Sequence, residues 1–169
     1  TQGALQVDEG FQQYPASGVL NVGKELMTFT RVNANFFLTR GQFGTQAAAH
    51  SAGATVQECI RYEGANVIDI ARDLLLKAGV ENSFIPFADW EAERDIRLEL
   101  NNYSRIMSKP TGVSKLLSEL SEQSLISILW DERTQEVKLK SASPPVDFST
   151  IPVINDDANF IKGSLKVDR

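Results

Sequence analysis

ANVIDIARDLLLKAGV, residues Ala65–Val80, is the stretch on which the fold class depends. Its apolar residues recur at i, i+3, i+4, i+7, i+8 and i+11, which places them on one face of an α-helix. These residues are Val67, Ile70, Ala71, Leu74, Leu75 and Ala78. Asn66 is suited to cap the first turn and Gly79 to end the last one. We therefore predict an amphipathic helix over this stretch.

The residues before this helix predict β-structure. GVLNV (18–22) and ELMTFTRV (25–32) flank Gly23-Lys24, a two-residue signal for a hairpin. NAN (33–35) is a second turn signal, because asparagine tolerates left-handed backbone conformations. TVQECIRY (55–62) is a further candidate strand. Residues 1–62 are thus predicted to form a β-rich module.

The residues after this helix alternate between helix and strand patterns. A short helix is expected after Pro86 with Asp89 as its cap, followed by a strand over 96–106 that places Ile96, Leu98 and Leu100 on one side. A second amphipathic helix is expected within 108–124, and a hairpin over 125–140. The buried stripe of this second helix is Val113, Leu116, Leu117 and Leu120. The inward residues of the hairpin are Val137 and Leu139.

These patterns predict an α+β fold. A β-rich N-terminal module (1–62) is followed by a helix–strand–helix–hairpin module (63–145). Residues 146–169 are expected to be a linker or an edge strand, and we expect the chain to continue into a larger protein.

Composition limits the classes of function. The 169 residues are 42% hydrophobic and 23% charged, with a net charge of −5, which argues against sequence-specific nucleic-acid binding because duplex binding needs a basic face. A single cysteine excludes an internal disulfide and a cysteine-based zinc site. No apolar run approaches the roughly 20 residues needed to span a bilayer.

The connection LTRGQFGTQAAAHSAGATVQ (38–57) contains the only histidine, His50. Its glycines follow a predicted strand, as in phosphate-binding loops, but neither glycine-rich phosphate motif is present. His50 and Cys59 are candidates for a base and a nucleophile, but we expect an exposed, inert histidine and a cysteine packed in the core. The simplest interpretation is a shaped surface connection whose glycines take positive φ.

The acidic residues are the remaining candidates for chemistry. Asp89, Glu91, Glu93 and Asp95 surround Trp90, and paired carboxylates can hydrolyse glycans. Arg94 and Arg97 lie among them, which favours a solvated, partly ion-paired surface. Asp156 and Asp157 are either an ion site or a turn. We assign no catalytic residue, no cofactor and no metal ligand, and predict a protein that is not an enzyme.

Three stretches resemble tail hub proteins of long-tailed bacteriophages. The most specific is GVLNVGKELMTFTRV followed by FFLTRGQFGTQAAAHSAGATVQ, within 18–57. The others are NVIDIARDLLLKAGV with FIPFADWEAE, and KPTGVSKLLSELSEQSLISILWDERTQEVKLKSASPP. The resemblance covers most of residues 18–145. Hub proteins of this kind have several β domains, of which this chain carries only part.

This resemblance implies a virion structural protein at the tail tip or baseplate, assembled in the host cytoplasm. It implies a homo-oligomer, with a trimer favoured, that closes the tail tube and joins the distal tail ring to fibre or receptor-binding proteins. Possible interface residues are Phe43, Gln42 and Trp90, with Phe43 either filling a pocket on a partner or covering its own core. The alternatives are a tail-associated glycan hydrolase using residues 89–95, or a carbohydrate- or receptor-binding module using Trp90 or Trp130.

Overall fold

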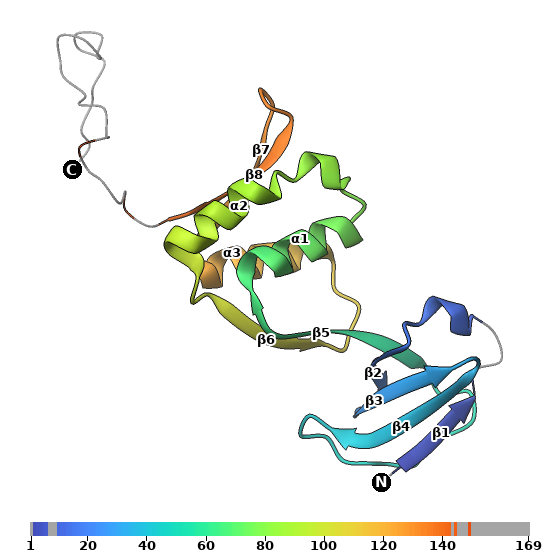
Figure 1. Ribbon diagram of the computed structural model, residues 1–169. Coiled ribbons are helices and arrows are strands. Elements are labelled where there is room, and N and C mark those ends of the chain that lie inside the picture. The colour runs from blue at the N-terminus through green and yellow to red at the C-terminus, as the bar shows by residue number, and fades with distance from the viewer. Residues whose placement is uncertain (1, 7–9, 143, 145–148, 150–169) are drawn as a thin grey trace, which may run out of the picture.

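The computed structural model describes residues 2–6, 10–142, 144 and 149. An N-terminal β-sheet and a C-terminal group of helices are joined by one long strand, so the fold is α+β with a β-rich N-terminal part, as predicted (Figure 1). The strands are β1 (Gln2–Gln6), β2 (Ser17–Val22), β3 (Glu25–Val32), β4 (Asn35–Gln42), β5 (Val56–Asn66), β6 (Asn102–Met107), β7 (Ile126–Asp131) and β8 (Glu136–Ser141). The helices are α1 (Val67–Lys77), α2 (Phe87–Glu93) and α3 (Val113–Ser124), with 3-10 helices η1 (Phe11–Gln13) and η2 (Asn82–Phe84) and a π-helix η3 (Arg94–Leu98).

The main sheet is antiparallel and has the strand order β1-β4-β3-β2-β5-β6. Both predicted turns are confirmed: Val22 pairs with Glu25 across Gly23-Lys24, and Asn33 lies between β3 and β4 with φ 53°. β5 is the strand that pairs with β2 near its start and with β6 near its end. It therefore links the sheet to the helices.

The N-terminal sheet has its own apolar core. Alternate residues of β3 and β4 are buried over much of each strand, as period-two strands require, and β2 adds Leu20 and Val22 to the same core. The cluster consists of Leu20, Val22, Met27, Phe29, Phe36 and Leu38. Tyr14 lies edge-on to Phe36 with 5.4 Å between ring centroids, which closes one side of this core.

A second core lies between α1, α3 and the β7–β8 hairpin. The predicted helix is confirmed, and Asn66 caps it by accepting a 3.2 Å hydrogen bond from the Ile68 amide. One expected core residue is different: Ala78 is the exposed C-cap, whereas Ile68 is buried. The stripe of α3 packs here through Leu116 and Leu120.

The predicted strand over residues 96–100 is wrong. These residues form η3 and the turn after it, and β6 begins only at Asn102. Successive residues of a helical turn point in different directions, so Leu98 is buried while Ile96 is exposed and Leu100 is 88% exposed. The ion pair of Arg97 with Glu93, four residues earlier, fits this helical path.

The predicted hairpin is confirmed as β7 and β8, with Val137 and Leu139 buried. α3 begins at Val113 with Gly112 as its N-cap and no capping side chain. None of the helices in the described part of the chain is both long enough and apolar enough to cross a bilayer.

Candidate functional site

A buried carboxylate is the centre of the most connected polar cluster. Glu25 begins β3 and is 1% exposed. It lies in phase with Met27 and Phe29 on the buried face of the strand, so its charge must be compensated inside the protein. Arg40, on the neighbouring strand β4, provides that charge through Nε at 3.0 Å from Oε1 and Nη2 at 2.6 Å from Oε2. This two-point contact fixes both side chains.

The end of β4 and the connection between β4 and β5 supply the other partners of Glu25. The amides of Gly41 and Ala48 each donate to the carboxylate at 3.0 Å. His50 Nε2 lies 2.8 Å from Oε2, and Arg40 also donates to the carbonyl of Ala48. The end of β4 and two points of the connection are thus held to one buried charge.

These contacts determine the charge state of Glu25. The hydrogen bond from Arg40 contributes most to lowering the pKa of Glu25 to about 2, and the contacts from Ala48, His50 and Gly41 add to it, against the opposing effect of burial. Glu25 is therefore ionised at neutral pH and accepts hydrogen bonds only. A carboxylate so fully engaged holds structure and is not available as a general acid.

The backbone of the connection explains two glycines. Gly41 has φ 61°, and a Cβ there would lie 3.0 Å from the amide nitrogen of Ala47. Gly44 has φ 78°. Thr45 closes the turn, because its Oγ1 accepts from the Leu26 amide at 3.0 Å and donates to the Gln42 carbonyl at 2.8 Å. The interpretation of the glycines as positive-φ positions is confirmed.

His50 corrects one expectation. It is exposed, as expected, but it is not inert, because its imidazole is a partner of Glu25. Cys59 is buried in β5 as expected, and burial raises the pKa of its thiol, which opposes formation of a nucleophilic thiolate. Within the described residues no contact joins His50 to Cys59, since the sulfur lies 3.9 Å from the Gln57 carbonyl and the imidazole lies on Glu25.

Phe43 and Gln42 lie on the outer side of this anchored connection. Phe43 has φ 53° and is 40% exposed, and the Cζ atom of Arg61 is 4.9 Å from its ring centroid. Gln42 is half-buried and donates from Nε2 to the Arg40 carbonyl at 3.0 Å. The Phe43 ring thus rests on a cation of its own chain while keeping one part in solvent.

Trp90 is buried inside the protein, whereas an interface residue would lie at the surface. Its side chain is 1% exposed, and its indole Nε1 donates to the Val137 carbonyl at 3.0 Å. The ring packs in the C-terminal core, so it offers no surface to a partner or a glycan in this conformation. Trp130 is 49% exposed and lies edge-on to Phe84, with ring centroids 5.6 Å apart.

The acidic residues around Trp90 separate into two groups. Asp89 and Asp95 are exposed and Glu91 is half-buried, and all three contact basic side chains, which matches the predicted solvated, ion-paired surface.

Glu93 is instead buried, where it accepts from the Ser141 amide at 3.0 Å and contacts Arg97 and Lys140. Burial opposes ionisation, but the contacts with Ser141, Arg97 and Lys140 together outweigh it and lower the pKa of Glu93. It joins α2 to β8.

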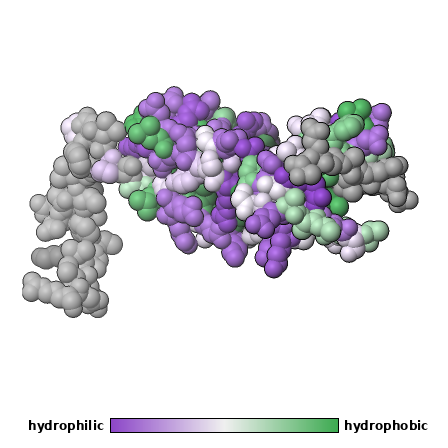
Figure 2. All heavy atoms as spheres, turned by 90° about the horizontal axis from the view of Figure 1, so that it is seen from below, coloured by the Kyte–Doolittle hydropathy of each residue, from purple (hydrophilic) through white to green (hydrophobic). Residues whose placement is uncertain are grey.

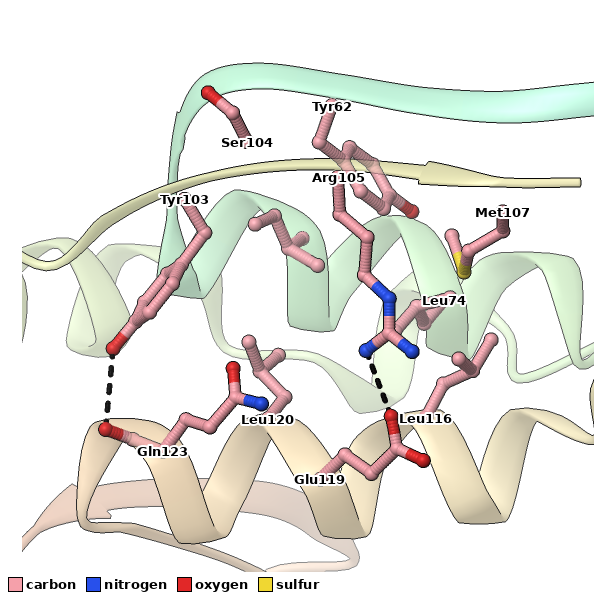
Figure 3. A pocket seen from close by; sticks show the side chains of 11 residues that line it. Tyr62, Leu74, Tyr103, Ser104, Arg105, Met107, Leu116, Glu119, Leu120 and Gln123 are labelled. Carbon is pink, nitrogen blue, oxygen red and sulfur yellow. Dashed lines mark hydrogen bonds and ion pairs between the residues drawn. The ribbon is translucent and has the colours of Figure 1, made fainter. Parts of the chain in front are cut away.

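One cavity lies between β5, β6 and the helices α1 and α3 (Figure 3). Its volume is about 260 Å³, with Leu74, Leu116 and Leu120 among its apolar lining. Arg105 reaches across to Glu119 at 2.7 Å (Figure 3). The other residues that line the cavity are Tyr62, Ile70, Tyr103, Ser104, Met107 and Gln123.

The tyrosine hydroxyls of this cavity are also engaged by the protein. Tyr62 donates to Asp73 at 2.6 Å, and Tyr103 contacts the Gln123 carbonyl and the Ser124 hydroxyl. Burial, with the contact to Asp73, raises the pKa of Tyr62, so it stays protonated. The cavity thus has apolar walls, and its two tyrosine hydroxyls and the pair of Arg105 with Glu119 are already engaged.

Within the described ranges, no group of three or more His, Cys, Asp or Glu side chains is placed to hold a metal ion. Asp156 and Asp157 lie outside the described residues, as does nearly all of 146–169.

Sequence reasoning missed Glu25 and Arg40. A signal for Glu25 was present, because it continues the buried period-two series Glu25, Met27, Phe29. A carboxylate in phase with core residues requires a buried partner. Nothing in the sequence identified Arg40 as that partner, because the pairing of β3 with β4 sets their contact.

Comparisons of this chain with models of protein families, with curated proteins and with solved structures find no match.

Proposed function

We propose that this chain is a structural module of a bacteriophage tail hub or tail tip and that it works by assembly. The observation that carries the proposal is the anchoring of residues 41–50 on Glu25. Those residues belong to the segment 18–57, where the resemblance to tail hub proteins is most specific. In this chain its charged residues are used to hold a connection in one shape.

A pre-shaped exposed connection suits assembly, because little conformational entropy is lost when a partner binds it. Phe43 is the side chain that such a partner would contact, since it is partly exposed two residues after the anchored Gly41. The partners implied are the distal tail ring and fibre or receptor-binding proteins. A homo-oligomer, with a trimer favoured, would place the chain at the tail tip of the virion.

The distribution of acidic residues supports assembly over glycan hydrolysis. Glu25 and Glu93 are buried and fully engaged, and the other acids of this group, Asp89, Glu91 and Asp95, contact basic side chains. Figure 2 shows the face seen from below as mainly hydrophilic, with separate hydrophobic patches.

Immunogold electron microscopy of particles from the source lysate tests the proposal. An antibody to this chain should label one end of the tail. Label absent from intact particles, with the chain abundant in the same lysate, would overturn the assignment. A cell-wall lysis assay distinguishes the hydrolase alternative, because an assembly module should produce no clearing.

A further inference from the structure

The β7–β8 hairpin has two edges that differ in cover and in charge. On the β8 side, Trp90 donates to the Val137 carbonyl and Glu93 accepts from the Ser141 amide. These contacts from α2 occupy backbone groups that point away from β7. β8 also carries the charged residues Glu136, Lys138 and Lys140. The β8 edge is therefore protected against pairing with a further strand.

The register shows which groups of β7 point outward. Val137 pairs with Trp130, and Leu139 pairs with Ile128, without irregularity. Residues opposite one another in an antiparallel ladder point their amides and carbonyls either both inward or both outward. The Val137 carbonyl points away from β7, so the amide and carbonyl of its partner Trp130 point away from β8. The amide and carbonyl of Ile128 do the same, because alternate residues of a strand direct these groups to the same side. Among the described residues, no hydrogen bond from another element reaches these groups.

The outer part of β7 has none of the usual protection of an edge strand. Residues Leu125–Trp130 contain no charge and no proline. Leu129 is 50% exposed and Trp130 is 49% exposed, on opposite faces of the strand. Figure 1 shows the tip of the hairpin projecting beyond the helices. By contrast β6, at the end of the main sheet, carries Arg105 and polar side chains.

We propose that β7 pairs with β7 of a second copy of this chain, antiparallel and with the two-fold axis at Leu129. The inference rests on the hairpin alone and does not depend on the proposed function. The two-fold pair that it gives for the isolated chain differs from the trimer favoured for the assembled tail tip. In this register Ile128 of each copy lies opposite Trp130 of the other copy, which gives two such pairs. Each of these opposed pairs exchanges two hydrogen bonds, giving about four in all. The product is a sheet of the order β8-β7-β7-β8.

Side-chain chemistry favours a second copy as the occupant. Aromatic and β-branched residues are favourable cross-strand pairs, and Ile128 with Trp130 is such a pair. Two exposed Leu129 side chains meet at the axis, where apolar area is removed from water. The nearest charged residue, Asp131, lies opposite Ser127 of the other copy. No like charges face each other, although the chain carries a net charge of −5.

Sedimentation equilibrium of the full chain tests this pairing, with concentrations up to about 1 mM because small interfaces are weak. The expected mass rises from one chain to two. Leu129→Lys and Leu129→Glu should each weaken self-association about 10-fold or more, since each places like charges at the axis. An equimolar mixture of the two variants should restore a pair. Leu100→Lys and Leu100→Glu are matched controls at another exposed leucine and should associate as the parent does.

Hydrogen exchange of the parent chain gives a second measurement that needs no substitution. The amides of Ile128 and Trp130 should gain protection as concentration rises, while those of Ser127 and Leu129 change less. A mass of one chain throughout, a mass of three, or a variant mixture that does not pair would overturn the inference. Unchanged exchange at Ile128 and Trp130 would do the same.

Discussion

Glu25 is the residue on which the conformation of the connection between β4 and β5 depends. Its carboxylate is a common acceptor for Arg40, His50 and two backbone amides. Removing one partner of such a buried pair leaves the other charge uncompensated, which costs more than the pair itself contributes. A single substitution at Glu25 in β3 should therefore disturb the conformation of the connection between β4 and β5, although the two are distant in sequence.

Glu25→Gln should lower the free energy of unfolding by about 3 kcal/mol, because Arg40 then loses its counter-charge. Urea denaturation measures this loss. Glu58→Gln is the matched control: Glu58 is exposed on β5, and its change should stay within about 0.5 kcal/mol. Equal effects of the two substitutions would contradict the assigned role of Glu25.

The free energy of unfolding should depend on pH through the titration of Glu25. Its folded pKa of about 2 lies below the ordinary value of 4.5, so the unfolded chain binds the proton more readily. The stabilisation is complete above about pH 4.5 and is lost as pH falls toward 2.

Thermal unfolding across this window should show a shallower acid decline for Glu25→Gln than for the parent. Parallel declines in the two proteins would mean that Glu25 titrates normally in the folded state.

At the scale of elements, α2 is joined to the hairpin by Trp90 and Glu93. Trp90 contributes a buried indole and one hydrogen bond to the Val137 carbonyl, and Glu93 contacts the backbone and side chains around Ser141. A helix of seven residues has little intrinsic stability, so these contacts hold it in place.

Trp90→Phe should cost about 2–3 kcal/mol in chemical denaturation, because it removes buried volume and leaves the Val137 carbonyl without its donor. Trp130→Phe is the control at an exposed tryptophan and should cost less than about 1 kcal/mol. If Trp130→Phe proved the more damaging of the two, the assignment of the core residue would be wrong.

For the whole molecule, two apolar clusters lie at the two ends of β5 (Figure 1). One is formed by β2, β3 and β4, and the other by the helices and the hairpin. β5 is continuous through the predicted boundary at residues 62 and 63, with an irregularity between Tyr62 and Ala65. That boundary stays a prediction.

Phe36→Ala tests whether the two clusters unfold separately. The cavity should cost the N-terminal sheet about 3–5 kcal/mol. Native-state hydrogen exchange should then accelerate in β2, β3 and β4, while amides of α1 and α3 keep their protection. Uniform acceleration along the chain would show that one cooperative unit spans both clusters.

Sequence reasoning succeeded where the determinant is local. The 3.6-residue period of Val67–Leu75 and the cap Asn66 specify α1, and Gly23-Lys24 and Asn33 specify turns whose backbone angles few residues tolerate. The α+β class and the Leu125–Lys140 hairpin follow from such signals. The prediction failed at Ile96–Leu100, because alternation over five residues fits a strand as well as a helical turn with one buried residue.

The sequence by itself thus determined which segments become strands or helices and which apolar faces are buried. Only the tertiary structure decided that Glu25 meets Arg40 and His50 and that Trp90 is enclosed. It also decided that α2 covers the outer edge of β8, whereas no described residue hydrogen-bonds to the outward groups of Ile128 and Trp130 in β7. These contacts join residues up to 48 positions apart, through strand pairing and helix packing. Periodicity along the chain does not encode them, because it describes each segment relative to itself and not relative to its neighbours.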